Sequence, residues 1–320
     1  MNSLRRELSV QEILDGFKNK DRNILSRAIS LIESEAEKDQ KKAEEVLSHF
    51  LSFDGKSNRI GITGVPGAGK STFINQYGEM LCQSGKQVAV LTIDPSSTIS
   101  GGSILGDKTR MNDLSQNSGA YIRPSPSLGY LGGVAARTRE TILLCEAFGF
   151  DTVIIESVGV GQSEHELSTM VDAYVMLALS GSGDDLQGIK RGILESADLI
   201  IFHKADGDNK NRAKLASQEM ASALQILRKE PVPICLVSST ERTGFGTFED
   251  TLNDWLKQQT DNGKFKARRL QQKIIWLEKA IEQKILYQFR SDKVTQAKLQ
   301  NIKDEVLREK THPLQVLKLI

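Results

Sequence analysis

Residues 59–72 combine a short apolar run, a glycine-rich turn and a helix-forming stretch, in that order. The turn at 64–71 has the pattern G-x-x-x-x-G-K-[ST] of a P-loop, whose backbone N–H groups surround a phosphate at the N-terminus of the next helix. In such a loop Lys70 reaches the β- and γ-phosphates, and the Ser71 hydroxyl ligates Mg²⁺. The motif therefore predicts a strand, a loop and a helix of an α/β sheet, with a nucleoside triphosphate as ligand. The expected contacts in this loop are Gly64, Val65, Pro66, Gly67, Ala68, Gly69, Lys70, Ser71 and Thr72.

Short β-branched runs alternate with helical stretches between residue 59 and about residue 258. This alternation predicts an α/β fold with a mostly parallel sheet, helices on both faces, and ligands bound beyond the carboxyl ends of the strands. The expected strands are 60–63, 88–93, 120–122, 152–155, 173–179, 199–202 and 234–237.

The two ends of the chain have helical periodicity instead. Residues 9–51 predict two or three amphipathic helices, and the tail from Lys264 predicts a long helix followed by another. We expect a helical extension at 1–55, a P-loop domain at 56–260 and a helical dimerisation segment at 261–320. The tail helix carries an apolar stripe, which folds back on the sheet or meets a second chain, and periodicity does not decide between these. The stripe consists of Leu270, Ile274, Leu277, Ile281, Ile285 and Phe289.

The composition is that of an ordinary globular protein, with 39% hydrophobic and 26% charged residues and a formal net charge of +1. This balance gives no electrostatic reason to expect nucleic acid or an anionic membrane as a partner. The start of the chain lacks the apolar core of a signal peptide, and we expect a soluble, cytoplasmic protein. The three cysteines have no C-x-x-C spacing, which favours buried thiols over a zinc or nickel site.

Carboxylates follow two further strands. Asp94 comes directly after the strand at 88–93, where it can hold Mg²⁺ or its waters. The strand at 152–155 ends in Glu156-Ser157-Val158-Gly159, which is similar to the D-x-x-G switch of GTPases with Glu in place of Asp. There Glu156 can sense the metal, and the N–H of Gly159 can donate to a γ-phosphate.

The strand at 199–202 is followed by His203-Lys204-Ala205-Asp206, where GTPases carry N-K-x-D. The Asp206 carboxylate can accept hydrogen bonds from guanine N1–H and the exocyclic amine, which adenine does not offer, while the stem of Lys204 covers the base. His203 is either a nearby hydrogen-bond donor or a strand-end residue with no role at the nucleotide. The strand at 234–237 is followed by a loop of small residues, at the position where GTPases have a loop that closes over the base. This loop consists of Ser238, Ser239 and Thr240.

Four segments together resemble the methylmalonyl-CoA mutase-associated GTPases of the MeaB/ArgK type, which are P-loop GTPases. The segments are 64–71, 94–97 with 101–111, 156–164, and 183–190, and the tract 123–127 with 131–133 is also similar. The likeness extends over roughly residues 10 to 300. This chain departs from the usual family pattern at three positions, with His203 for Asn, Ser157 for Thr and Ser239 for Ala.

The resemblance implies that Asp94, Asp107 and Glu156 surround Mg²⁺ together with Ser71. It also implies nucleotide switches at 94–111 and 156–164 and a third, partner-sensing switch at 183–191. Family members are homodimers joined through C-terminal helices. The mobile polar residues of the switches are Arg110, Gln187 and Lys190. The expected catalytic set is Lys70, Asp107, Arg110, Glu156 and Lys190.

By this resemblance, the leading function is a GTP-hydrolysing chaperone, cycling between GTP and GDP with Mg²⁺. It would dock on an adenosylcobalamin-dependent acyl-CoA mutase and gate cofactor loading and rescue of inactivated enzyme. The alternative is a kinase that phosphorylates the periplasmic binding proteins of the LAO/AO transport system, for which we find no separate acceptor-positioning base. A metal-delivery GTPase would need clustered Cys or His near the switches, and a binding module without hydrolysis would fit if His203 abolished nucleotide selection.

Overall fold

A computed structural model describes residues 6–34, 36–51, 53, 55–94, 111–126, 137–157, 166–180, 191–228 and 230–314. The chain divides into two compact units, Met1–Phe265 and Lys266–Ile320. The first unit contains the sheet and the helices packed on it, and the second contains most of one long helix and the helix after it. No helix in the described ranges is both long enough and apolar enough to span a membrane.

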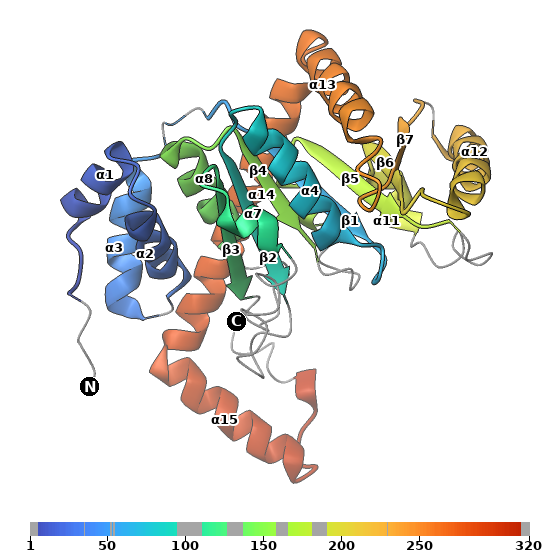
Figure 1. Cartoon of the computed structure of the whole chain (residues 1–320). Coiled ribbons are helices and arrows are strands. Elements are labelled where there is room, and N and C mark those ends of the chain that lie inside the picture. The colour runs from blue at the N-terminus through green and yellow to red at the C-terminus, as the bar shows by residue number, and fades with distance from the viewer. Residues whose placement is uncertain are drawn as a thin grey trace. The chain divides into compact units, whose positions relative to one another are not determined.

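The first unit is built on one sheet whose strands, within the described residues, are all paired in parallel. Their order across the sheet is β3-β2-β4-β1-β5-β6-β7, so β1 is central and the P-loop follows the middle of the sheet (Figure 1). The predicted α/β sheet is confirmed. The strands are β1 (Asn58–Gly64), β2 (Val88–Asp94), β3 (Ala120–Pro126), β4 (Thr152–Glu156), β5 (Ala173–Ala178), β6 (Leu199–His203) and β7 (Ile234–Val237).

Helices cover both faces of this sheet because alternate strand residues point to opposite sides. On β2, Val88 and Val90 pack with helices α4, α7 and α13, whereas Ala89 and Leu91 pack with α8 and the N-terminal helices. Helices α11 and α12 pack beside β5 and β6. The helices of this unit are α1 (Val10–Lys18), α2 (Arg22–Glu33), α3 (Glu37–Ser48), α4 (Lys70–Gln83), α7 (Asn112–Gln116), α8 (Thr138–Phe148), α11 (Arg191–Ser196), α12 (Asn209–Leu227) and α13 (Phe245–Asp261).

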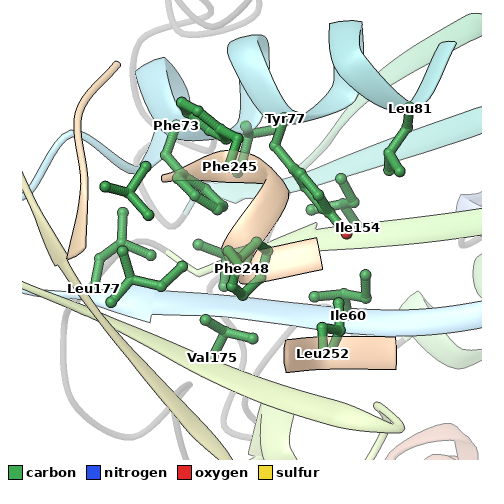
Figure 2. Packing of buried hydrophobic residues seen from close by; sticks show 14 of the residues in the cluster. Ile60, Phe73, Tyr77, Leu81, Ile154, Val175, Leu177, Phe245, Phe248 and Leu252 are labelled. Carbon is green, nitrogen blue, oxygen red and sulfur yellow. The ribbon is translucent and has the colours of Figure 1, made fainter. Parts of the chain in front are cut away.

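Aromatic packing fixes the helix that follows the P-loop. Figure 2 shows Phe73 and Tyr77 of α4 directed toward Phe245 and Phe248 of α13, above the residues of β1 and β5. The Phe73 ring centroid lies 5.4 Å from that of Phe245 and 5.4 Å from that of Phe248. The buried Tyr77 hydroxyl donates a hydrogen bond to Glu249 of α13. Stacked and edge-to-face rings of this kind orient α4, and with it the loop at its start.

Helices α1 and α2 pack against α8, and α3 packs on α1 and α2, in the same unit as the sheet (Figure 1). Phe17 of α1 stacks on Phe50 with ring centroids 4.8 Å apart and meets Phe148 of α8 edge-on at 5.6 Å. The start of α1 is fixed by a capping box, in which the Ser9 hydroxyl accepts the Glu12 N–H and the Glu12 carboxylate accepts the Ser9 N–H. The predicted N-terminal helices are confirmed as three helices.

Three aspartates tie the amino ends of neighbouring strands together in the same way. Asp151, Asp172 and Asp198 directly precede β4, β5 and β6. Each donates its own N–H to the carbonyl of the residue opposite, which lies in or directly before the neighbouring strand of the sheet, and its carboxylate accepts that residue's N–H. The residues opposite are Gln87, Arg59 and Tyr174, with N–H to carboxylate distances of 2.7, 2.9 and 2.9 Å respectively. We call these contacts the aspartate pairs.

The C-terminal part of the chain is helical, as predicted, with α14 (Lys264–Ser291) and α15 (Lys293–Leu307). The two helices are separated at Asp292, whose carboxylate accepts the N–H of Thr295 and caps α15. The predicted apolar stripe lies on α14, and five of its members are 43 to 60% exposed. They are Leu270, Ile274, Leu277, Ile281 and Ile285.

Candidate functional site

The P-loop leaves the central strand and turns into α4 through glycines that hold left-handed conformations. Gly67 has a φ of +82° and Gly69, the N-cap of α4, a φ of +86°. At Gly64 an added Cβ would lie 2.4 Å from the carbonyl oxygen of Leu177 on β5, so the loop backbone passes close to the next strand. The Lys70 ammonium is buried and donates to the Gly64 carbonyl at 2.8 Å. Left-handed glycines and a buried lysine at the start of a helix are the features of a phosphate-binding loop.

A hydroxyl and a carboxylate meet beside the loop. Glu156 ends β4, which lies next to β1, and its side chain accepts a hydrogen bond from the Ser71 hydroxyl at 2.9 Å. Glu156 is only 9% exposed. Asp94 ends β2, the neighbour of β4 on the other side, although its side chain is outside the described part of the structure. Hydroxyl and carboxylate oxygens are the ligands that Mg²⁺ prefers, so the residues brought together here fit that ion.

The strand-end residue after Glu156 also contacts the central strand. The Ser157 N–H donates to the Ile62 carbonyl at 3.0 Å, and the Ser157 hydroxyl donates to the Thr63 hydroxyl at 3.0 Å. Both side chains are buried. The serine at this position therefore helps to hold the end of β4 against the end of β1, and Thr63 is a residue that sequence analysis did not single out.

On the other side of the P-loop, His203 at the end of β6 lies between the P-loop and the loop after β7. Its Nδ1 lies 2.7 Å from the Ala68 carbonyl oxygen of the P-loop, and its Nε2 lies 2.7 Å from the Ser239 hydroxyl. The ring is 2% exposed. Burial lowers the pKa of His203, and the nearby Lys204 cation lowers it further, against opposing effects from the Ala68 bond and Asp206. The ring is therefore neutral at physiological pH.

The carboxylate expected to read the base is held by the loop at 238–240, called the base loop below. The Ser238 hydroxyl donates to Asp206 at 2.5 Å and accepts the Glu241 N–H at 3.0 Å. Lys204 has a φ of +58° and its ammonium donates to the Gly67 carbonyl at 3.0 Å, so its stem crosses the P-loop. Thr240 is exposed. The side chains predicted to select guanine thus lie together beside the P-loop.

Two residues that support this arrangement were not predicted. Asn209 donates to the Lys204 carbonyl at 2.6 Å and accepts from Ser180 at 2.8 Å, which stabilises the unusual backbone of Lys204. The Glu241 carboxylate accepts the Gly207 N–H at 3.2 Å. Polar residues three positions after Asp206 and Ser238 are a turn signal that could have identified both.

Several predicted site residues lie outside the described residues. They are Asp107, Arg110, Gly159 and Lys190, with most of the expected switches at 94–111, 156–164 and 183–191. Among the described residues no three His, Cys, Asp or Glu side chains gather into a metal-binding group. Cys145 and Cys235 are buried free thiols, and Cys82 is only half-buried, which corrects the expectation that all three are buried.

Comparison with known proteins supports the resemblance noted in the sequence. The family described as Methylmalonyl Co-A mutase-associated GTPase MeaB matches residues 25–294. GTPase ArgK of Escherichia coli is 43% identical over 284 residues, covering 88% of this chain and 86% of that protein. The mitochondrial methylmalonic aciduria type A homolog of Mus musculus is 40% identical over 296 residues, covering 88% and 71% respectively. A crystal structure described as an LAO/AO transport system kinase has a TM-score of 0.75 and 34% identity, covering 99% of this chain and 97% of the other.

Proposed function

Because this chain belongs to the MeaB family of methylmalonyl-CoA mutase-associated GTPases, we propose that it hydrolyses GTP with Mg²⁺ and acts on an adenosylcobalamin-dependent acyl-CoA mutase. In this role its nucleotide state gates the loading and protection of the mutase cofactor. The observation that carries the proposal is the convergence of three groups at the carboxyl ends of the strands. These groups are the Lys70 ammonium in the P-loop, the Ser71–Glu156 contact, and Asp206 beside the base loop.

Each group has a distinct part in nucleotide binding and hydrolysis. The Lys70 ammonium neutralises charge on the β- and γ-phosphates, and the N–H groups at the start of α4 surround the same oxygens. Asp206 accepts the two guanine N–H donors, which adenine lacks at these positions. Mg²⁺ held by Ser71, Asp94, Asp107 and Glu156 would supply charge neutralisation at the γ-phosphate. Catalysis of phosphoryl transfer depends mainly on such positioning and charge.

The nucleotide site is tested by Lys70→Ala. We expect this variant to lose GTP hydrolysis and to bind GTP and GDP much more weakly than the wild type, because the cation facing the phosphates is removed. Calorimetry measures both affinities. Unchanged GTP affinity in the variant would reject the assigned phosphate site.

The role of Asp206 is tested by competition in the wild-type protein, where we expect GTP to displace GDP more effectively than ATP does. Equal displacement of GDP by ATP and by GTP would reject the assigned base site.

The mutase partnership is tested by GTP hydrolysis with and without an adenosylcobalamin-dependent acyl-CoA mutase. A partner that binds one nucleotide state better must change nucleotide affinity by the same factor. We expect the mutase to accelerate hydrolysis, and Gln187→Ala in the segment 183–191 to remove most of this acceleration while intrinsic hydrolysis stays within a few-fold. Undiminished acceleration in that variant would mean that the segment does not sense the partner.

A protein kinase is the second candidate, because the structural relative at 34% identity is described as an LAO/AO transport system kinase. Incubation with γ-labelled GTP and a periplasmic binding protein for lysine, arginine or ornithine separates the two functions. We expect the label to appear as free phosphate. Stoichiometric transfer of label to the binding protein would favour the kinase over the chaperone.

A further inference from the structure

His203 connects two loops that approach a nucleotide from different sides. Its Nδ1 faces the Ala68 carbonyl of the P-loop and its Nε2 faces the Ser239 hydroxyl of the base loop, each at 2.7 Å. The three residues come from distant parts of the chain, with Ala68 135 positions and Ser239 36 positions from the histidine. One imidazole ring thus spans the space between the phosphate-binding and base-binding loops.

The surrounding atoms hold the ring in one orientation. A Cβ added at Gly69 would lie 2.7 Å from His203 Nδ1, so the ring packs directly on the P-loop backbone. On the side of α4, Phe73 meets the ring edge-on with centroids 6.1 Å apart and an interplanar angle of 84°. Because His203 is 2% exposed, rotation about its side-chain bonds would break one buried and one partly buried hydrogen bond.

The chemistry of the two partners determines the tautomer. A carbonyl oxygen only accepts hydrogen bonds, so the hydrogen of the neutral ring lies on Nδ1 and is donated to Ala68. Nε2 is then an acceptor and needs a donor, which the Ser239 hydroxyl supplies. An alanine at 239 would leave Nε2 without this donor. The two departures from the usual family pattern, His for Asn at 203 and Ser for Ala at 239, are therefore complementary.

We propose that His203 and Ser239 act as a coupled pair of positioning residues, which hold the P-loop and the base loop at the spacing that a bound guanine nucleotide requires. This inference rests on the proposed nucleotide site. Selection of the base remains the role of Asp206. The His203–Ser239 pair instead holds the two loops in place before the nucleotide binds, which lowers the entropy cost of binding.

The difference in length between histidine and asparagine at position 203 allows the contact with Ser239 to be tested. An asparagine at 203 places its amide nitrogen near the position of Nδ1 and keeps a donor for Ala68, but it is one atom too short to reach Ser239. We expect Ser239→Ala and His203→Asn each to weaken binding of a fluorescent methylanthraniloyl-GDP about fivefold, mainly through faster dissociation. The double variant should be no weaker than His203→Asn alone, since the contact is already lost. Ser222→Ala, at an exposed serine of α12, is the matched control and should bind like the wild type.

The outcomes separate this inference from the proposed function. Wild-type affinity in Ser239→Ala, or a double variant weakened by the product of the two single effects, would overturn the coupled pair. Failure of the wild-type protein itself to bind the GDP probe would instead reject the nucleotide site. Thermal melting of each variant checks that the fold is retained, and ATP should remain a poor competitor in all of them because Asp206 is unchanged.

Discussion

The Glu156 carboxylate at the end of β4 is buried beside the P-loop, where it accepts a hydrogen bond from the Ser71 hydroxyl. Glu156→Gln keeps the size of the side chain and removes its charge. We predict that the variant needs about tenfold more Mg²⁺ for half-maximal GTP hydrolysis, whereas its affinity for GDP changes little, because the metal mainly organises the γ-phosphate. A magnesium titration of initial rates measures this. Glu45→Gln, at an exposed position of α3, should titrate like the wild type, and an identical titration for Glu156→Gln would remove Glu156 from the metal site.

His203 should also give stability a specific dependence on pH. Burial holds its pKa below the usual value of about 6.5, with Lys204 lowering it and Asp206 raising it. The unfolded chain therefore binds more protons than the folded chain near that pH, and stability rises with pH toward about pH 6.5 and is lost as the pH falls through this window. We predict that the difference in melting temperature between the wild type and His203→Asn grows from about pH 5 to about pH 7. A difference that stays constant over this range would contradict a buried neutral imidazole.

Among the sheet elements, the aspartate pair at the start of β5 should contribute measurably to stability. Asp172 is 1% exposed and joins β5 to β1 through the backbone of Arg59. We predict that Asp172→Ala lowers the free energy of unfolding by about 2 kcal/mol, since a charge-assisted hydrogen bond is lost and the partly buried N–H of Arg59 loses an acceptor. Asp172→Asn keeps an acceptor oxygen and should cost less. Urea denaturation measures both, and equal losses in the two variants would mean that the bond contributes little.

The strands and helices of this chain could be predicted because their signals are local. Alternating β-branched runs and helical stretches predicted the parallel α/β sheet, and the P-loop predicted the turn into α4. The order β3-β2-β4-β1-β5-β6-β7 could not be obtained in this way, because it depends on contacts between segments far apart in the chain. The aspartate pairs were missed for the same reason, since each aspartate contacts the residue opposite only after the strands are side by side.

The site was predicted unevenly. The P-loop pattern and the residues 203–206 identified where a nucleotide would lie, and the structure brings these residues together. For His203 the sequence left open a hydrogen-bonding role and a strand-end role. The answer required the positions of Ala68 and Ser239, which no local pattern contains. The geometry of Asp107, Arg110, Gly159 and Lys190 stays a prediction from the family resemblance.

For the whole molecule, we propose a homodimer formed through α14. The exposed stripe of five aliphatic side chains on this helix is apolar surface that association would remove from water. Light scattering of the full chain should give about twice the mass of the 35.4 kDa polypeptide. The double variant Leu277→Glu and Ile281→Glu should give a monomer, because it places charges in the interface, while Lys279→Glu is a control for added negative charge on the same helix. A wild-type protein that scatters as a monomer at micromolar concentration would contradict the dimer.

The aspartate pairs lie at the opposite end of the strands from the nucleotide site. Each aspartate lies directly before a strand and bonds to the backbone at the start of the neighbouring strand, which helps to align the two. These residues are Asp151, Asp172 and Asp198. The residues proposed to bind the nucleotide, by contrast, lie in the loops after β1, β4, β6 and β7. The residues that align the strands and the residues proposed to recognise the ligand therefore lie in separate segments of the sequence. We therefore expect a loop at the carboxyl ends of the strands to tolerate replacement while the aspartate pairs keep the strands in register.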